Sequence, residues 1–586
     1  MAVFKIGINM AGAISAGAYT AGVLDFLTEA LDEWYRAKQE GKPVPMHDVS
    51  IEVFSGASAG GMCAAISAVM LQENFEHIHD TTKRDTTNRF YESWVNKIDI
   101  KELLQTEDLK NARSVVSLLD STVIRQIAEY ALTPASSRVT RPYVSPVLNL
   151  FLSLTNLRGV PYSLNAAAPG SIEETTFFYG DRIRFQTTSS GTGAQLIGST
   201  RTLDLLTPGE KGGWSVLQSA AISTGAFPIF LAPGTLERSA CEYVPPHWKS
   251  VISDISNTPS ITPNFPKDFP EAFPTLNVDG GVTNNDPFNY AHDFLAGLNP
   301  PLTEEQRLGR PSHVDRAVIT IAPFPTTEPF DPKFDPKRAA SILSALPKLV
   351  SALISQSRFF GESLSEIMTG TTFDRFIIAP SDYDLTREHL NTDVSIPPPA
   401  LQCAALGAFG GFFEREFRAH DYALGRRNCQ KFLKDSFVLP AENPTIKAGL
   451  ECMDTRTRDI VVTKYRCSAP GTYAQTAADL QQNKAALPEA QREEGDLWIP
   501  IIPLCSELVS EEVPRANRAR IKRANLDIIV TLVLRRYKVL VPYLIDLIPS
   551  WLFRQFLRLG QPFIRALARK PLTAALKREL GDSYEP

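Results

Sequence analysis

Short apolar runs and small-residue turns alternate along the first part of the chain. Residues 3–9 alternate weakly in the manner of a strand, and residues 20–40 repeat apolar side chains at helical spacing up to Gly41. A second strand is predicted over 49–54, followed by a tight turn and a second helix that begins near Ala59. Because a strand, a tight loop and a helix occur twice in succession, the pattern predicts an α/β fold with a parallel sheet.

The remainder of the chain contains fewer clear elements. Residues 77–140 are charged and predicted to be largely helical, and residues 405–437 also have a helical pattern. Further strands are predicted at three apolar runs, namely 153–157, 316–322 and 374–379. We therefore expect three parts: a large α/β domain, an irregular extension and a helical tail, over 1–440, 441–514 and 515–586.

The overall composition is ordinary, but the net charge differs strongly between the tail and the rest of the chain. With 586 residues, 43% of them hydrophobic and 21% charged, the chain is typical of a large globular protein, and nothing in it indicates nucleic-acid binding. Residues 515–586 contain 15 Lys and Arg but five Asp and Glu, a net charge of +10. Because the whole chain has a net charge of −5, residues 1–514 have a net charge of −15. Such an asymmetry is typical of a tail that meets an anionic surface.

Cysteine usage and the N-terminal segment bear on location and cofactors. The seven cysteines are scattered without a CxxC pair, which argues against a disulfide framework and against a zinc site. We expect no metal, no cofactor and a reducing, cytoplasmic compartment. The apolar start of the chain is interrupted by Gly7, Gly12 and Gly17, so we interpret it as a buried strand and loop rather than a cleaved signal segment.

The stretch GASAG, residues 56–60, matches the G-x-S-x-G pattern around Ser58. In this pattern the serine lies on a strained turn between a strand and a helix, because Gly56 and Gly60 let the backbone bend sharply. The N–H groups of the following helix favour an anion beside the serine. A packing turn of small residues would have the same composition, but the predicted strand before Ser58 and the helix after it favour a nucleophile.

A serine nucleophile needs a base, and Asp279 is a stronger candidate than any of the eight histidines. Asp279 ends a short apolar run and precedes Gly280 and Gly281, whose lack of side chains lets a carboxylate lie close to another loop. The alternative is an Asp-Gly hairpin turn, but the residues that follow are typical of a loop that caps a helix. His77 and His79 lie in a charged segment, and we expect them to be solvated.

The segment MAGAISAG, residues 10–17, lies between the first predicted strand and the first helix. Its backbone amides would emerge beside Ser58 and could form an oxyanion hole. A phosphate-binding loop fits less well, because neither the GxGxxG nor the GxxxxGK[ST] spacing is present.

These three motifs, in this order, resemble the patatin-like phospholipases, which have a glycine-rich oxyanion loop, a G-x-S-x-G serine and a D-G-[AG] aspartate. Residues 153–164 and 219–230 are similar to the family as well, and the resemblance covers about residues 3–325. It implies a three-layer α/β/α sandwich with a mostly parallel sheet. The family loop is usually GGGxRG, whereas this chain has AGAISAG without the arginine; we expect Gly12 and Ala13 to supply the oxyanion donors.

The resemblance implies a lipid acyl hydrolase of the phospholipase A type. Asp279 would accept the proton of Ser58, Ser58 would attack the ester carbonyl, and water would release the fatty acid from the acyl-enzyme. Two alternatives stay open. One is an α/β-hydrolase esterase or thioesterase with a Ser58, Asp279 and His292 triad, and the other is a lipid- or partner-binding protein without activity.

The tail has the layout of helices that lie in a membrane interface. Residues 526–570 contain no run of the roughly 18 apolar residues that a membrane span requires. Basic residues recur at helical spacing between apolar faces, as at Arg554, Arg558, Arg565 and Arg569. We predict that residues 515–586 bring the chain to anionic membranes. The alternative is a helical pair that packs on the acidic body and covers the site.

Overall fold

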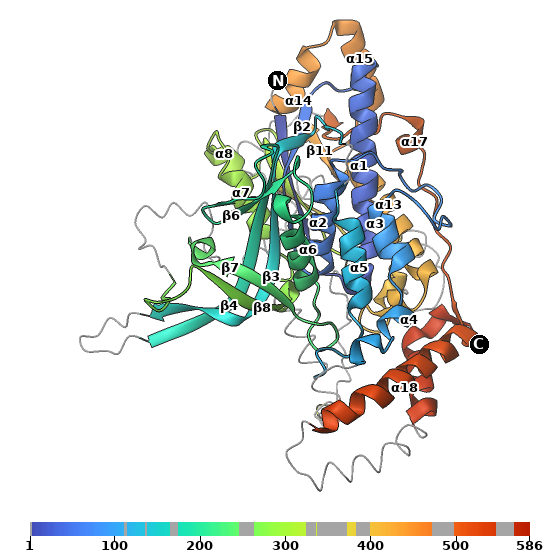
Figure 1. The fold of residues 1–586 in the computed structure, drawn as a ribbon. Helices are drawn as coiled ribbons and strands as arrows, with labels where there is room; N and C mark the ends of the chain where they lie inside the picture. The colour runs from blue at the N-terminus through green and yellow to red at the C-terminus, as the bar shows by residue number, and fades with distance from the viewer. Residues whose placement is uncertain are drawn as a thin grey trace.

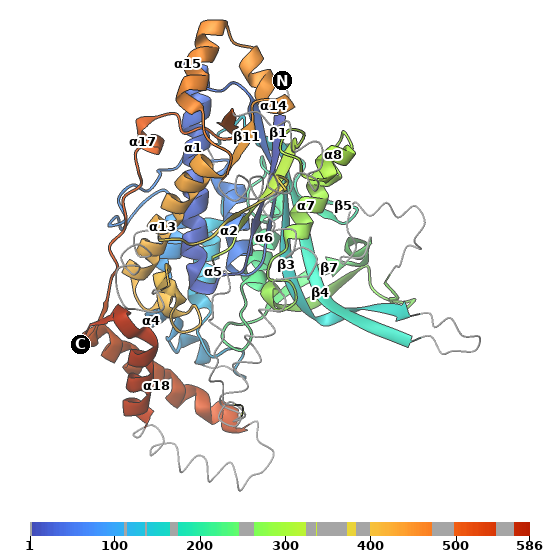
Figure 2. The ribbon, with the colours of Figure 1, turned by 180° about the vertical axis from the view of Figure 1, so that it is seen from behind.

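The computed structural model describes residues 3–110, 114–134, 138–164, 174–244, 263–323, 336, 372–382, 399–470, 497–546 and 568–585. Figures 1 and 2 show a central sheet with helices on both faces and the C-terminal helices at one end of the molecule. The strands of the main sheet are β1 (Val3–Met10), β2 (Asp48–Gly56), β3 (Val144–Leu164), β4 (Glu174–Thr188), β5 (Leu196–Ile197), β6 (Thr200–Asp204), β7 (Gly234–Ser239), β8 (Ala272–Asp279), β9 (Arg316–Ile321) and β10 (Arg375–Ile378).

The sheet is mostly parallel, as the sequence predicts. Its order is β10-β9-β1-β2-β3-β4-β6-β5, and β8 joins β7 to β3. The strands from β10 to β3 are parallel neighbours, so the carboxyl ends of β1 and β2 lie at the same edge, with Met10 opposite Gly56. Loops that follow these two strands are therefore adjacent. Strands β8 and β4 run antiparallel to β3.

Helices form a layer on each side of the sheet (Figure 1). One side carries α1 (Gly17–Gln39), α2 (Ala59–Met70), α6 (Trp214–Thr224) and α13 (Arg415–Asp435), and the other carries α7 (Phe288–Ala296). Neighbouring residues of β9 point to opposite layers, because Ile319 belongs to the core beneath α1 while Val318 packs beneath α7. The three-layer α/β/α architecture is thus the expected one.

The first helix packs very closely on a helix from the C-terminal half. A side chain added at Gly22 of α1 would overlap the backbone of Tyr422, and one added at Gly425 of α13 would overlap the backbone of Tyr19. Glycine at both positions lets the two helix backbones approach closely. Residues beyond 400 are therefore part of the main core.

Several predicted helices are shorter in the structure. Residues 77–140 contain short helices instead of a long one: α3 (Arg89–Tyr91), the π-helix η2 (Glu92–Lys97), α4 (Ile100–Leu103), η3 (Glu107–Leu109) and α5 (Thr122–Ala131). In 405–437 the α-helix begins only at Arg415, after the 3-10 turns η7 (Gln402–Ala404) and η8 (Gly410–Phe412). The backbone of Gly407 has a φ of 60°, which a continuous right-handed helix cannot contain.

The remaining described elements are short or belong to the last third of the chain. The short ones are η1 (Ile14–Ala16), η4 (Glu210–Gly212), η5 (Ala240–Tyr243), η6 (Gly280–Val282), α8 (Glu304–Arg307), α17 (Glu507–Ser510) and η10 (Gly581–Ser583). The extension contains α14 (Pro444–Glu451) and α15 (Thr455–Tyr465), and β11 (Val438–Pro440) pairs with β12 (Trp498–Pro500). Trp498 and Ile499 lie in the main core. The boundaries at 440 and 514 stay predictions.

The tail contains one long described helix, α18 (Arg523–Asp546), and β13 (Ile521–Lys522) pairs with β14 (Tyr584–Glu585) near the end of the chain. None of the described helices combines the length and the apolar composition that crossing a bilayer requires. The predicted interfacial residues Arg554, Arg558 and Arg565 lie outside the described residues.

Helix α18 packs against the body of the protein. Its Leu526 and Ile529 share an apolar cluster with Leu103 and Leu119. The guanidinium of Arg536 is buried, donates two hydrogen bonds of 2.8 Å to Asp108 and also donates to the carbonyl of Leu118. Part of the tail is therefore anchored on the segment around residues 103–119.

Candidate active site

Ser58 lies on a strained turn between β2 and α2. Its backbone angles are φ 53° and ψ −129°, a region that non-glycine residues rarely occupy. A side chain at Gly56 would overlap the backbone of Gly60, and one at Gly60 would overlap the carbonyl of Met10. The two glycines of the motif are thus required by close backbone contacts within the turn and with β1, in agreement with the sequence-based prediction of the strained turn.

The structure brings the predicted serine and aspartate together. Asp279 ends β8 opposite Leu154 of β3, and the hydroxyl of Ser58 donates a hydrogen bond of 2.6 Å to Asp279 Oδ2. The other carboxylate oxygen accepts the N–H of Gly281 at 2.7 Å. A side chain at Gly280 would overlap the backbone of Ser153, so the Gly-Gly pair does let this loop approach its neighbour.

Among the described residues, the carboxyl group of Asp279 is hydrogen-bonded to neutral groups, the hydroxyl of Ser58 and the amide of Gly281, and its side chain is almost fully buried. Burial raises the pKa of Asp279 from the ordinary 3.8 to about 7, although the hydrogen bonds from Ser58 and Gly281 act in the opposite direction. A carboxyl with this pKa can exchange a proton near neutral pH, which is the property that a general base needs.

The loop between β1 and α1 lies beside Ser58, as predicted. The N–H of Gly12 donates to the carbonyl of Asn285 at 3.0 Å, so this amide already has an acceptor. Within the described residues, no acceptor is found for the amides of Ala13 and Ile14. The N–H of Ala59 is the first of α2 and has no partner inside that helix. The expected pair Gly12 and Ala13 stays a prediction, and Gly12 is the weaker of the two.

Thr224 is a residue of the site that sequence reasoning did not find. Its hydroxyl accepts the N–H of Ser58 at 3.0 Å and donates to the carbonyl of Ser153 at 2.6 Å. It thereby links the turn to β3, the strand that pairs with the end of β8. The only sequence signal was its position inside the small-residue segment 219–230.

A mostly apolar pocket opens beside Ser58 and Asp279. Both residues form part of its wall, and the pocket holds about 860 Å³ of empty space, including space open to solvent. Most of the wall is aliphatic or aromatic and comes from several elements, for example Met62 of α2, Ile127 of α5, Phe227 and Phe409. Such a lining favours an apolar ligand over a charged one.

Histidine does not contact the serine or the aspartate in the described part of the chain. His292 lies on α7, where Nε2 is 3.3 Å from Asp374 Oδ2 and the ring stacks on Phe288. Although burial lowers its pKa, the neighbouring Asp293 and Asp374 raise the pKa of His292 to about 9. The six histidines that the structure describes all have partners away from Ser58.

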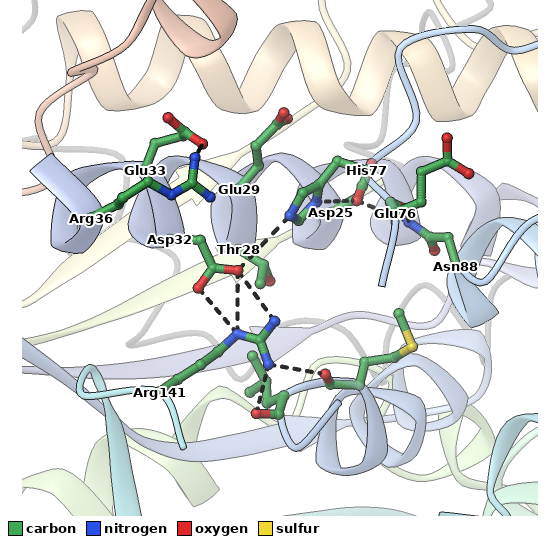
Figure 3. Close-up of polar contacts among 12 residues, drawn as sticks. Asp25, Thr28, Glu29, Asp32, Glu33, Arg36, Glu76, His77, Asn88 and Arg141 are labelled. Atoms are coloured by element: carbon green, nitrogen blue, oxygen red, sulfur yellow. Dashed lines mark hydrogen bonds and ion pairs between the residues drawn. The ribbon is translucent and has the colours of Figure 1, made fainter. Parts of the chain in front are cut away.

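The expectation that His77 is solvated is wrong. Its Nδ1 is 2.8 Å from Asp25 Oδ1, and Figure 3 shows the ring between Asp25 and Asp32 of α1. Arg141 approaches Asp32 from the other side with hydrogen bonds of 3.2–3.3 Å. The charges of this segment pair with one another and with α1, so its charged composition reflects buried ion pairs as well as surface. His79 is half exposed and pairs with Glu29.

Comparisons with known proteins support a relation for the first half of the chain. Residues 9–292 match the family model described as patatin-like phospholipase. A protein of Sinorhizobium fredii (strain NBRC 101917 / NGR234), named uncharacterized protein y4iI, is 33% identical over 486 residues, which are 76% of this chain and 66% of that protein. The chain thus spans less than two thirds of the length of that relative. The crystal structure of VipD from Legionella pneumophila is similar at 12% identity over 100% of this chain and 88% of that chain, with a TM-score of 0.22, too low to carry an argument.

Proposed function

We propose that the chain hydrolyses fatty-acyl esters of lipids, with Ser58 as nucleophile and Asp279 as base, and the match of residues 9–292 to the patatin-like phospholipase model supports this proposal. The observation that carries the proposal is the 2.6 Å hydrogen bond from the Ser58 hydroxyl to Asp279 at the wall of an apolar pocket. The strained backbone of Ser58 supports it further, because such strain persists where function needs it.

The proposed reaction has two steps. Asp279 takes the hydroxyl proton as Ser58 Oγ attacks the ester carbonyl, and the amides of Ala13 and Ala59 stabilise the negative oxygen. Collapse of this intermediate breaks the ester bond, and Asp279 returns the proton to the leaving alcohol. Water then attacks the acyl-enzyme with Asp279 again as base, which releases the fatty acid and restores Ser58. The pKa of about 7 at Asp279 suits both directions of transfer.

The lining of the pocket supports a lipid substrate of the phospholipase A type. An acyl chain is uncharged and apolar, and the wall around Met62, Ile127 and Phe227 would remove it from water. The ester carbonyl would then lie at Ser58, with the head group towards solvent. A charged or strongly polar acyl group would lose its hydration in this pocket without gaining partners.

The proposal is tested with a fluorophosphonate probe and a long-chain ester. We expect the full chain to be labelled and Ser58→Ala to lose both labelling and hydrolysis, the latter by about a thousandfold or more. Ser55→Ala is the matched control, because Ser55 is also buried, lies on β2 just before the turn of Ser58, and donates to Asn9 at 3.0 Å. Retained labelling in Ser58→Ala would place the nucleophile elsewhere, and a full chain that shows neither labelling nor hydrolysis would favour a binding protein.

We further propose that the basic tail brings the protein to anionic membranes. Lys522, Arg535 and Lys538 are exposed on the described part of the tail, and each basic residue near an anionic surface contributes about 1 kcal/mol. Removing the tail would expose Leu103 and Leu119, which share an apolar cluster with α18, so substitution of the three exposed cations by Gln is the sharper experiment. We expect weaker co-sedimentation with anionic vesicles and unchanged behaviour with neutral ones.

The alternative for the tail is that it covers the pocket. Leu103 and Leu119 line the pocket and also belong to the apolar cluster that contains Leu526 and Ile529 of α18, which supports some control of access by the tail. If the triple Gln variant binds anionic vesicles like wild type, the membrane proposal is wrong. If Arg536→Gln, which loosens α18, raises hydrolysis of a soluble ester, the tail acts as a cover.

A further inference from the structure

The loop between β1 and α1, residues 11–16, is held by a segment far away in the sequence. The hydroxyl of Ser15 donates to the carbonyl of Ala408 and accepts the N–H of Gly411 at 3.1 Å. The N–H of Ser15 donates to the same carbonyl at 3.2 Å. Ser15 is fully buried, and a side chain at Gly411 would overlap the Ser15 hydroxyl. This contact joins residues 11–16 to the segment 402–412, which lies outside the family match.

The loop that Ser15 holds is strained at the position next to it. Ile14 has a φ of 48°, which is an outlier for a β-branched residue. The amides of Ala13 and Ile14, for which the described residues offer no acceptor, belong to this same turn. A strained turn keeps its conformation only where surrounding contacts impose it, and Ser15 supplies three of those contacts.

The segment 402–412 is itself fixed from α13. Asp421 accepts the N–H groups of Gln402 at 2.8 Å and Cys403 at 2.9 Å. Arg418, also buried, donates to the carbonyl of Gly411 at 2.7 Å and to that of Val95 at 3.0 Å and 3.2 Å. Backbone groups at both ends of the segment are therefore bonded to charged side chains of one rigid helix.

The same segment contacts the pocket and the start of the tail. Phe409 and Phe412 form part of the pocket wall. At the other end of the segment, the side-chain amide of Gln402 donates to the carbonyl of Ala519 at 2.8 Å and accepts its N–H at 2.9 Å. The segment thus lies between the residues that precede α18 and the loop beside Ser58.

We propose that Ser15 is a positioning residue, which fixes the oxyanion loop against residues 402–412, so that the C-terminal half of the chain sets the activity of the patatin-like half. The inference rests on the proposed function. Loss of the Ser15 hydroxyl leaves the buried N–H of Gly411 without its acceptor and releases the strained turn at Ile14. The amides of the loop would then no longer be held where charge develops in the transition state.

The test compares Ser15→Ala with Ser67→Ala in the full chain, using a soluble acyl ester. Ser67 is a matched control, because it is also buried and its hydroxyl donates to a backbone carbonyl, that of Cys63, at 2.9 Å. We expect kcat of Ser15→Ala to fall about tenfold with KM within about twofold of wild type, since binding of the acyl chain does not use the loop. Ser67→Ala should keep kcat whatever its thermal stability.

A second variant tests the connection to the tail. Gln402→Ala removes both hydrogen bonds to Ala519 without touching the loop beside Ser58, and we expect a smaller fall in kcat, about threefold, again with KM unchanged. Wild-type kcat in Ser15→Ala overturns the proposal, as does an equal fall of kcat in Ser67→Ala, and wild-type kcat in Gln402→Ala alone overturns the connection to the tail.

Failure of this inference can be told apart from failure of the proposed function. Ser58→Ala is measured in the same assay. If Ser58→Ala keeps hydrolysis, the proposed nucleophile is wrong and the inference falls with it. If Ser58→Ala is inactive while Ser15→Ala has the kcat of wild type, only the positioning role of Ser15 is wrong.

Discussion

Asp279 and Asp25 are both buried aspartates, but they have different partners. Asp279 is bonded to a hydroxyl and an amide, those of Ser58 and Gly281. Asp25 on α1 is bonded to the guanidinium of Arg426, to His77 at 2.8 Å and to Asn88 at 2.9 Å. The region around Asp25 is shown in Figure 3.

The two surroundings shift the two pKa values in opposite directions. Burial raises the pKa of Asp279 to about 7, because no cation compensates it. Burial would raise the pKa of Asp25 as well, but Arg426 and His77 outweigh it and hold that pKa far below its ordinary 3.8. Burial alone therefore does not make a base. The same side chain serves proton transfer where its partners are neutral, and structural pairing where they are cationic.

Among the variants that distinguish the two aspartates, Asp279→Asn is expected to have the largest effect. The amide keeps the shape of the side chain but cannot accept the Ser58 proton, so kcat/KM of ester hydrolysis should fall by about a thousandfold. The thermal midpoint should rise, because a buried carboxylate without a cation is removed. Steady-state kinetics and a thermal melt on the same sample check both. Activity near that of wild type would rule out the role of Asp279 as base.

Asp25→Asn should have the opposite result. It leaves the buried charge of Arg426 with Glu29 as its remaining carboxylate partner, so the free energy of unfolding should fall by about 3 kcal/mol, whereas hydrolysis by the folded protein is kept. Because the pKa of Asp25 is lowered, its contribution is present above the ordinary 3.8 and is lost as the pH falls below that value. Denaturant melts of wild type and Asp25→Asn at pH 7 and at about pH 2, well below the ordinary 3.8, measure this. A loss that grows towards acid pH would contradict the pairing.

The pH dependence of kcat/KM is a smaller effect, and it distinguishes the role of Asp279 as base from that of a structural aspartate such as Asp25. Hydrolysis needs the ionised form of Asp279, so kcat/KM should fall about tenfold per pH unit below about 7. The stability contributed by this group has the opposite sign: the folded state binds the proton more tightly than the unfolded state, so stability falls as the pH rises from 3.8 to about 7. A flat rate profile between pH 5 and pH 7 would mean that another group is the base.

The elbow and its aspartate were predictable because their requirements are local. Gly56, Gly60 and Gly280 lie within two positions of Ser58 or Asp279, and each is glycine because a backbone atom occupies the space of a side chain. The bond between Ser15 and Ala408 joins residues 393 positions apart, and no local pattern indicates it. Likewise, charge composition placed His77 in solvent, although its partner Asp25 lies on an earlier helix.

The bounds of some helices and strands were also not predictable from the local sequence. The core strand β3 was expected over 153–157, whereas it runs from Val144 to Leu164, because it continues as a partner of β4 beyond the buried part of the sheet. Helix α13 begins ten residues later than the apolar pattern of 405–437 suggested, because the preceding residues form the 3-10 turns that contact Ser15. In both cases a contact distant in sequence overrode the local pattern.

The smallest effect is expected for His292→Ala, which tests the triad that the sequence left open. His292 lies on α7, beneath the face of the sheet opposite α2, and its partner is Asp374 rather than Asp279. With a pKa of about 9 it holds its proton at neutral pH and cannot accept another. We expect kcat/KM to stay that of wild type, with a stability loss of about 1 kcal/mol from the broken pair and the lost stacking on Phe288. Steady-state kinetics of His292→Ala and Asp279→Asn, measured side by side, distinguish the triad from the serine–aspartate pair. If His292→Ala is inactive while Asp279→Asn is active, the site depends on a histidine triad and not on the serine–aspartate pair.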